Sequence, residues 1–197
     1  MKFDFSQAIK LENDRVLLLP LEQKDFENLL LFSENEKILW RYSLTPASGE
    51  DNLHKYIEHA LATRENQSGY PFVVFDKRTQ KIAGCTRFYD IQKAHNTLSI
   101  GYTWYGEEFQ RTGLNRNFKQ LLLCYAFETL EVERIEFRAD LRNKKCIQAM
   151  KSIGCEEEGV LRSNCSKTSG RRDSIVLSIL KSEWKKKGKA HLETKLY

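Results

Sequence analysis

The sequence predicts a single α/β domain in which a mixed sheet carries helices on both faces. Three observations favour this fold class. The hydrophobic residues alternate between strand and helix periods along the chain. The expected element order is β-α-α-β-β-β-α-β-α-β-β, and no repeat or linker divides the 197 residues. We therefore expect one domain over 1–197, with a core of about 12–185 and a basic, solvated C-terminal tail at 186–197.

The first half of the chain predicts one strand, two helices and a hairpin. Pro20 closes an apolar run, and Asp25 precedes apolar residues at helical spacing as a capping residue. Two β-rich segments follow, separated by the turn-like DKRTQ. The expected elements are a strand at 15–21, helices at 22–39 and 45–66, and strands at 70–76 and 81–91.

The second half alternates strands and helices. Ile135, Phe137 and Ala139 alternate with charged residues, which is typical of a half-buried strand, and Gly154 suits a helix C-terminus. The expected elements are strands at 98–105 and 134–141, helices from about 115 and at 143–155, and closing strands at GVLRS and 174–180.

The composition restricts the class of protein. The formal net charge of +5 favours an anionic ligand and is weak evidence for nucleic acid. No stretch reaches the length of about 20 apolar residues that a membrane span needs, and the N-terminus lacks the apolar region of a signal peptide. The five cysteines form no CxxC pair, which disfavours disulfides and a structural zinc site. We expect a reduced, cytoplasmic setting.

The segment 109–123, FQRTGLNRNFKQLLL, is the clearest candidate site. A polar loop leads into a helix, whose first N–H groups are unpaired and carry positive partial charge. Gly113 allows close approach of the backbone, Asn115 is a favourable N-cap, and Arg111 and Arg116 add donors. The pattern predicts an anion site, with an ordinary strand–turn–helix as the alternative. Neither GxxxxGK[ST] nor GxGxxG occurs.

Two longer patterns resemble a known family, the GNAT N-acetyltransferases. QRTGLN at 110–115 is similar to the family's pyrophosphate loop, Q/R-x-x-G-x-G/A, and NKKCIQAMKSIGC at 143–155 resembles its N-x-x-S/Y-x-x-A-x-x-x-x-G-F helix. EGVLR at 158–162 and GRRDSIVLSIL at 170–180 resemble the closing strands of the RimJ/RimL-type branch, which includes ribosomal-protein N-terminal acetyltransferases. The resemblance covers about residues 12–185.

The resemblance implies a mostly antiparallel mixed sheet, splayed open between its fourth and fifth strands, 98–105 and 134–141. Acetyl-CoA would lie in the splay. Its pantetheine arm would form backbone hydrogen bonds with the edge of strand 98–105, and its pyrophosphate would bind to the loop at 110–115. No metal is expected. The residues implied to bind acetyl-CoA are Tyr102, Thr103, Trp104, Gln110, Arg111, Thr112, Gly113, Leu114, Asn115, Arg116 and Asn143.

The resemblance also implies catalytic roles. Asn143 begins its helix and is expected to cap it from that position, while the resemblance implies that it also contacts the cosubstrate. Cys146 stands where the family usually has a Ser or Tyr that protonates the departing thiolate. A buried, inert cysteine is the alternative. The acid that many relatives carry on the fourth strand is missing, since Leu98 and Ser99 occupy those positions. Asp90, His95 and Glu136 are candidate bases by neighbourhood alone.

The implied activity is direct transfer of the acetyl group of acetyl-CoA to an amine, either a protein N-terminus or a small molecule. We expect a monomer or homodimer with no membrane partner. The departures at Ser99 and Cys146 leave a second hypothesis open, a catalytically impaired acetyl-CoA-binding or regulatory protein. A nucleic-acid-binding domain ranks low, because the basic residues are scattered.

Overall fold

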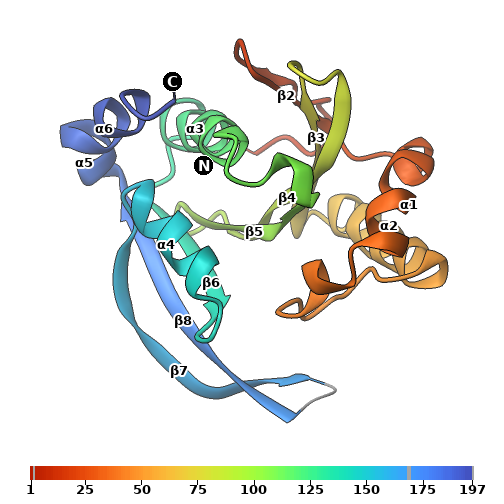
Figure 1. Ribbon diagram of the computed structural model, residues 1–197. Coiled ribbons are helices and arrows are strands. Elements are labelled where there is room, and N and C mark those ends of the chain that lie inside the picture. The colour runs from red at the N-terminus through yellow and green to blue at the C-terminus, as the bar shows by residue number, and fades with distance from the viewer. Residues whose placement is uncertain (2, 168–169, 197) are drawn as a thin grey trace.

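The computed structural model describes residues 1, 3–167 and 170–196. It has the predicted elements in their predicted order, with a further short strand at Leu11–Glu12 and further helices after Leu180 (Figure 1). The strands are β1 (Leu11–Glu12), β2 (Val16–Pro20), β3 (Gly69–Asp76), β4 (Lys81–Gln92), β5 (Thr97–Tyr105), β6 (Arg134–Asp140), β7 (Glu156–Lys167) and β8 (Gly170–Leu180). The helices are α1 (Phe26–Asn35), α2 (Glu50–Glu65), α3 (Leu114–Cys124), α4 (Lys144–Ser152), α5 (Lys181–Glu183) and α6 (Lys189–Glu193). Short turns of 3₁₀-helix (η1, Gln23–Asp25; η2, Lys37–Trp40; η3, Glu107–Phe109) and π-helix (η4, Tyr125–Thr129; η5, Trp184–Gly188) extend or connect them.

The predicted elements are confirmed, with differences at their ends. The helix expected at 22–39 is divided between η1, α1 and η2, and the closing strands are longer than GVLRS and 174–180. The two closing strands lengthen because they pair with each other as far as Lys167 and Gly170.

The C-terminal segment is folded, so the expectation of a solvated tail is wrong. Leu192 of α6 is fully buried, and Trp184 is almost fully buried eight residues earlier, on the same helical face. The segment packs on α3, where the side chain of Asn117 donates to the carbonyl of Leu196 over 3.4 Å.

The sheet has eight strands in the order β1-β2-β3-β4-β5-β6-β8-β7, and every neighbouring pair is antiparallel except β5 and β6. The parallel pair is short: it joins only Thr97–Ser99 of β5 to Arg134–Glu136 of β6. β6 then pairs along its whole length with β8, and Figure 1 shows this half of the sheet diverging from β2–β5. The prediction of a splay between these two strands is therefore confirmed.

A β-bulge in β5 lies where the strands part. In the register with β4, Trp104 opposes Cys85 and Gly101 opposes Arg87, so two residues of β5 face one residue of β4. Tyr102, one of the two, has a left-handed φ of 50°. A bulge of this kind bends and twists its strand, which accounts for the departure of β5 from β6.

Helices cover both faces of the sheet near the bulge. Thr103 Oγ1 accepts a hydrogen bond from Lys119 of α3, whereas the ring of its neighbour Trp104 lies 6.0 Å from that of Tyr56 of α2. Since successive residues of a strand point to opposite faces, α2 and α3 lie on opposite sides of β5.

Within the part of the chain that the structure describes, no helix combines the length and the apolar character needed to cross a membrane.

The close approach of β4 to β5 beside the bulge depends on Gly84. A Cβ at this position would lie 2.6 Å from the Cα of Tyr105 and closer still to the carbonyl oxygen of Trp104. We expect Gly84→Ala to lower the free energy of unfolding by at least about 2 kcal/mol, because backbone must move. Gly188→Ala is the control: its φ is helical (−62°), so its effect should stay below about 1 kcal/mol. Equal effects in urea unfolding would contradict the close packing.

Candidate active site

The loop before α3 has the geometry of an anion site. Gly113 is the N-cap residue of α3 and has a left-handed φ of 85°, a conformation that glycine adopts without strain. The helix therefore begins at Leu114, one residue earlier than predicted. The expectation that Asn115 is the N-cap is wrong, because Asn115 already lies inside the first turn. The side chain of Thr112 lies nearest the first helical N–H instead, 3.4 Å from the nitrogen of Leu114.

A cationic groove of about 860 Å³ lies beside this loop. Arg111, Thr112, Gly113 and Arg116 line it, whereas the side chain of Leu114 is fully buried. The charged lining residues are Arg15, Lys77, Arg78, Arg111, Arg116 and Lys195, with the acids Asp14 and Glu193. The excess of guanidinium and ammonium groups suits phosphate oxygens.

The edge of β5 beyond Ser99 faces the splay. Because β6 pairs with β5 only at Thr97–Ser99, the backbone around Tyr102 and Thr103 borders the gap. The side chain of Trp104 does not line the gap, since it is buried on the α2 face. The predicted contacts of residues 102–104 can therefore involve their backbone, and the carbonyl of Tyr102 also accepts from the Tyr56 hydroxyl over 3.4 Å.

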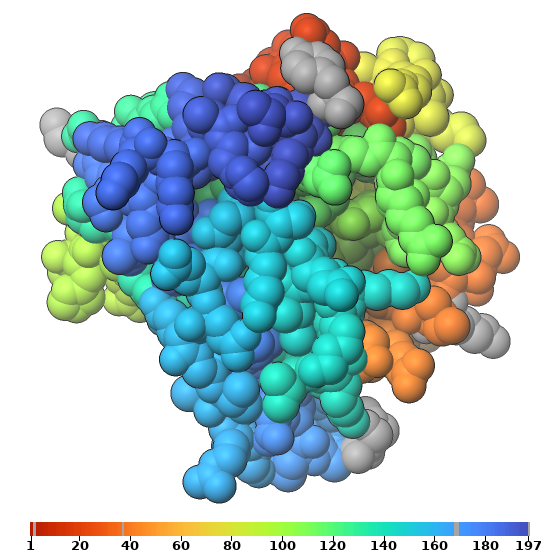
Figure 2. All heavy atoms as spheres, turned by 60° about the vertical axis from the view of Figure 1, so that its left-hand side comes forward, coloured from red at the N-terminus to blue at the C-terminus, as the bar shows by residue number. Residues whose placement is uncertain are grey.

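The start of α4 borders the same gap on the side opposite the edge of β5. Asn143 is the N-cap residue, and its side-chain oxygen accepts from the N–H of Cys146 over 3.2 Å, which confirms the predicted capping role. Burial raises the pKa of the Cys146 thiol, while the charges of Lys119 and Arg172 lower it. Figure 2 shows a recess between the cyan segment of α4 and the green segment that follows β5. The splay is thus open at the surface.

A buried lysine lies inside the splay and was not predicted. Lys119 is 5% exposed, and its Nζ donates to Thr103 Oγ1 over 2.8 Å; Thr103 Oγ1 lies 2.9 Å from Thr86 Oγ1. Burial lowers the pKa of Lys119 to about 7, against smaller opposing effects of Cys146 and Cys155. The sequence held a signal: Lys119 is three residues before Leu122, on the apolar face of the helix.

The candidate bases lie in unsuitable surroundings. Glu136 is held by two ion pairs, with Arg134 at 2.9 Å and Arg138 at 2.6 Å. Asp90 is exposed and accepts from Gln92 over 2.7 Å, and His95 is exposed in a turn. The structure brings none of the three into contact with Cys146 or Lys119.

The opposite face of β4 and β5 carries an aromatic cluster around a second buried cation. Arg87 is 1% exposed, its guanidinium lies 4.1 Å from the ring centroid of Tyr102, and none of its side-chain nitrogens bonds to a described residue. The rings of Trp40 and Trp104 are 4.9 Å apart nearby. Buried cations therefore flank the bulge of β5 on both sides.

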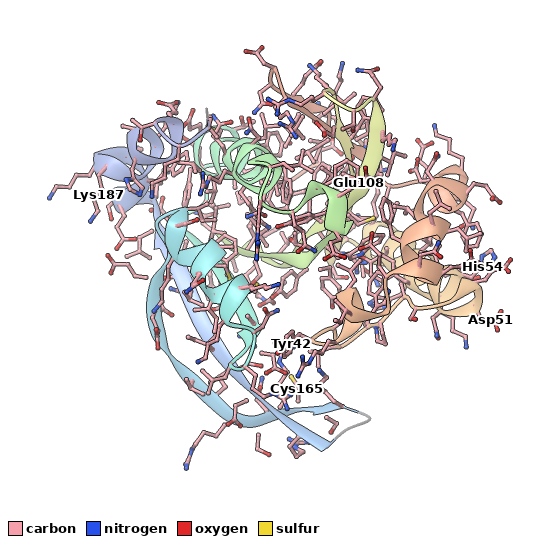
Figure 3. All side chains as sticks on the ribbon, in the orientation of Figure 1. Tyr42, Asp51, His54, Glu108, Cys165 and Lys187 are labelled. Carbon is pink, nitrogen blue, oxygen red and sulfur yellow. The ribbon has the colours of Figure 1, made fainter. Side chains whose placement is uncertain are left out.

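The β7–β8 hairpin reaches the segment that follows η2. Lys167 Nζ donates to the carbonyl of Arg41 over 3.0 Å and lies 5.9 Å from the ring centroid of Tyr42. Figure 3 shows Tyr42 beside Cys165 of β7. The hairpin thus contacts the loop between η2 and α2. Among the described residues, no group of three or more His, Cys, Asp or Glu side chains could hold a metal ion.

The pKa of Lys119 makes stability depend on pH. In the unfolded chain the lysine titrates near 10.5, so between about pH 7 and 10.5 the unfolded state binds more protons than the folded state. Below pH 7 the buried charge therefore lowers the free energy of unfolding by its full amount. The loss becomes smaller as pH rises through this window. We expect Lys119→Met to stabilise the protein, most at pH 7 and less toward pH 10.5. Urea unfolding tests this, with the exposed Lys145→Met as control; an effect of Lys119→Met that is independent of pH would contradict it.

Comparisons with known proteins agree with this geometry. The family described as "Acetyltransferase (GNAT) domain" matches residues 15–156. The chain is 26% identical over 177 residues to the "Putative ribosomal N-acetyltransferase YdaF" of Bacillus subtilis (strain 168), covering 87% of this chain and 94% of that protein.

Solved structures share the fold. A GCN5-related N-acetyltransferase from Brucella melitensis superposes with a TM-score of 0.88 at 24% identity, covering 97% of this chain and 86% of that one. A ribosomal-protein-S5-alanine acetyltransferase from Vibrio fischeri gives a TM-score of 0.71 at 19% identity, covering 89% and 98%. With the family match over most of its length and the splayed sheet, the chain belongs to the GNAT acetyltransferase family.

Proposed function

We propose that this protein is an N-acetyltransferase that transfers the acetyl group of acetyl-CoA to an amine on a protein N-terminus or a small molecule. The observation that carries the proposal is the parting of β5 from β6 beside the loop with Gly113, because together they offer a strand edge and an anion site. GNAT acetyltransferases use acetyl-CoA as cosubstrate.

The residues present fit acetyl-CoA. In this proposal the loop from Gln110 to Arg116 and the cationic groove bind the phosphates, and the edge of β5 at residues 102–104 binds the pantetheine arm. Asn143 positions the start of α4 against the thioester. When bound, acetyl-CoA supplies an activated acetyl group.

The chain's own groups would act mainly by positioning. An acceptor held against the thioester gains most of its rate from orientation, and the bulge offers backbone groups for the carbonyl oxygen. We propose Cys146 as the proton donor to the departing thiolate. Since burial raises the pKa of its thiol, Cys146 is a weak acid and needs nearby positive charge.

No dedicated base is proposed. Glu136 forms ion pairs with two arginines, which lowers its ability to accept a proton. Asp90 and His95 are exposed outside the splay. The acceptor amine would lose its proton to water. The rate is therefore expected to depend on the fraction of the amine that is already neutral.

A second candidate function is acetyl-CoA binding without efficient catalysis. The observation that favours it is the absence of a carboxylate in contact with Cys146 or Lys119 among the described residues. Such a protein would bind acetyl-CoA and release little thiol.

Acetyl-CoA is expected to raise the melting temperature, because it binds only the folded protein. Gly113→Val should weaken acetyl-CoA binding at least about tenfold in titration calorimetry. Gly49→Val is a matched control: Gly49 is also a helix N-cap residue with φ 85° and open surroundings. Both variants carry the same backbone strain, so equal losses of affinity would refute a role for the loop.

Thiol release on a panel of peptides and small amines separates the two candidate functions. We expect acetylation of at least one acceptor, with kcat lowered about tenfold in Cys146→Ala and largely kept in Cys146→Ser, whose hydroxyl also donates. Thiol release from no acceptor, with acetyl-CoA still bound, would favour the second candidate. Full activity of Cys146→Ala would remove the proton-donor role.

A further inference from the structure

The ammonium group of Lys119 lies between the two strands that part. From α3 it donates to Thr103 Oγ1 of β5 over 2.8 Å, and it lies 5.7 Å from the ring centroid of Phe137 of β6. Cys146, at the start of α4, is close enough for the two groups to influence each other's pKa. Lys119 thus faces the same gap as the thiol that is the candidate proton donor.

This cation has no counter-ion in the described part of the chain. Lys119 forms no ion pair with any carboxylate of the described residues. The titratable groups that face it are the thiols of Cys146 on α4 and Cys155 before β7. Arg172 of β8 adds further positive charge near Cys146. A buried, unpaired charge is costly, so an anion that forms beside it is stabilised.

Hydrogen bonds fix the direction of the ammonium group. Thr103 Oγ1 accepts from Lys119, and the hydroxyls of Thr103 and Thr86 lie 2.9 Å apart on neighbouring strands. Thr103 is one of the two bulged residues of β5, and Thr86 is the residue of β4 that faces them. A cation held in this way needs little reorganisation when negative charge develops, which is the condition for electrostatic catalysis.

We propose that Lys119 is a further catalytic residue, whose ammonium group stabilises the thiolate that departs when the acetyl group is transferred. The proposal rests on the proposed function, since the thiolate arises only if acetyl-CoA reacts in the splay. The same charge would also stabilise the thiolate of Cys146 after it gives up its proton.

The step balances as follows for the reacting atoms. The acceptor nitrogen forms a bond to the acetyl carbon, and the carbon–sulfur bond breaks with its electron pair going to sulfur. This sulfur takes the proton of the Cys146 thiol. The acceptor nitrogen loses a proton to water, and water returns a proton to Cys146. Lys119 keeps its proton throughout, so it must be charged when the bond breaks.

The direct test is the pKa of the thiol of bound CoA, followed by the ultraviolet absorbance of the thiolate. A free thiol of this kind titrates near 8.5. We expect wild-type protein to hold at least about tenfold more bound CoA as thiolate at neutral pH than Lys119→Met does. Lys187→Met, at an exposed position of η5, should match wild type. Titration calorimetry with CoA establishes that each variant is loaded.

The outcomes separate this inference from the proposed function. If CoA binds to both proteins and its thiol titrates equally in wild type and Lys119→Met, Lys119 has no such role and the proposed function stands. If wild type binds no CoA, the proposed function fails and the role of Lys119 fails with it.

Kinetics give a second readout. In Lys119→Met we expect kcat to fall about a hundredfold with the KM for acetyl-CoA little changed, because the interaction arises with the thiolate. Since Lys119 loses its proton near pH 7, the wild-type rate per neutral amine should decline above this pH, and the decline should vanish in Lys119→Met. A decline of the same midpoint in the variant would overturn the proposal.

Discussion

The parting of β5 from β6 is the constraint on which the candidate site depends. Three residues of each strand pair in parallel, and beyond them β6 keeps only β8 as its partner. The bulge at Tyr102 bends and twists β5, and β4 approaches β5 closely beside it at Gly84. The facing edges of β5 and β6 are thereby left unpaired beyond Ser99 and Glu136, and the loop before α3 and the start of α4 lie at the two sides of this gap.

Charge is concentrated where the strands part. Lys119 on the α3 face and Arg87 on the α2 face are both almost fully buried, and neither forms an ion pair with a described carboxylate. Such groups lower the stability of a protein, since each is costly to desolvate and has no opposite charge to offset that cost. An acyl transfer in which negative charge develops at this point gives a physical reason to retain the first of them, and the GNAT family performs such transfers.

The sequence was sufficient for the order of the main elements and for the loop, because these depend on hydrophobic period and on local motifs. The splay was expected only because the resemblance to the GNAT family implies it. Asn143 was recognised as a cap from its position before a helix. Asn115 was misplaced because Gly113 begins the helix with a left-handed φ that the sequence permits without requiring. The docked α6 was missed because a lysine-rich segment resembles a solvated tail, although Leu192 is buried. Lys119 was overlooked because its surroundings come from three elements distant in sequence: β5, β6 and α4.

A crystal structure with CoA would test the central claim most directly. We expect the pyrophosphate to contact the backbone N–H groups at the start of α3, the pantetheine arm to follow β5 at residues 102–104, and the sulfur to lie beside Cys146 and Lys119. CoA bound in the groove beside Arg15 and Arg78 with its arm outside the splay, or β5 and β6 closed against each other, would contradict it.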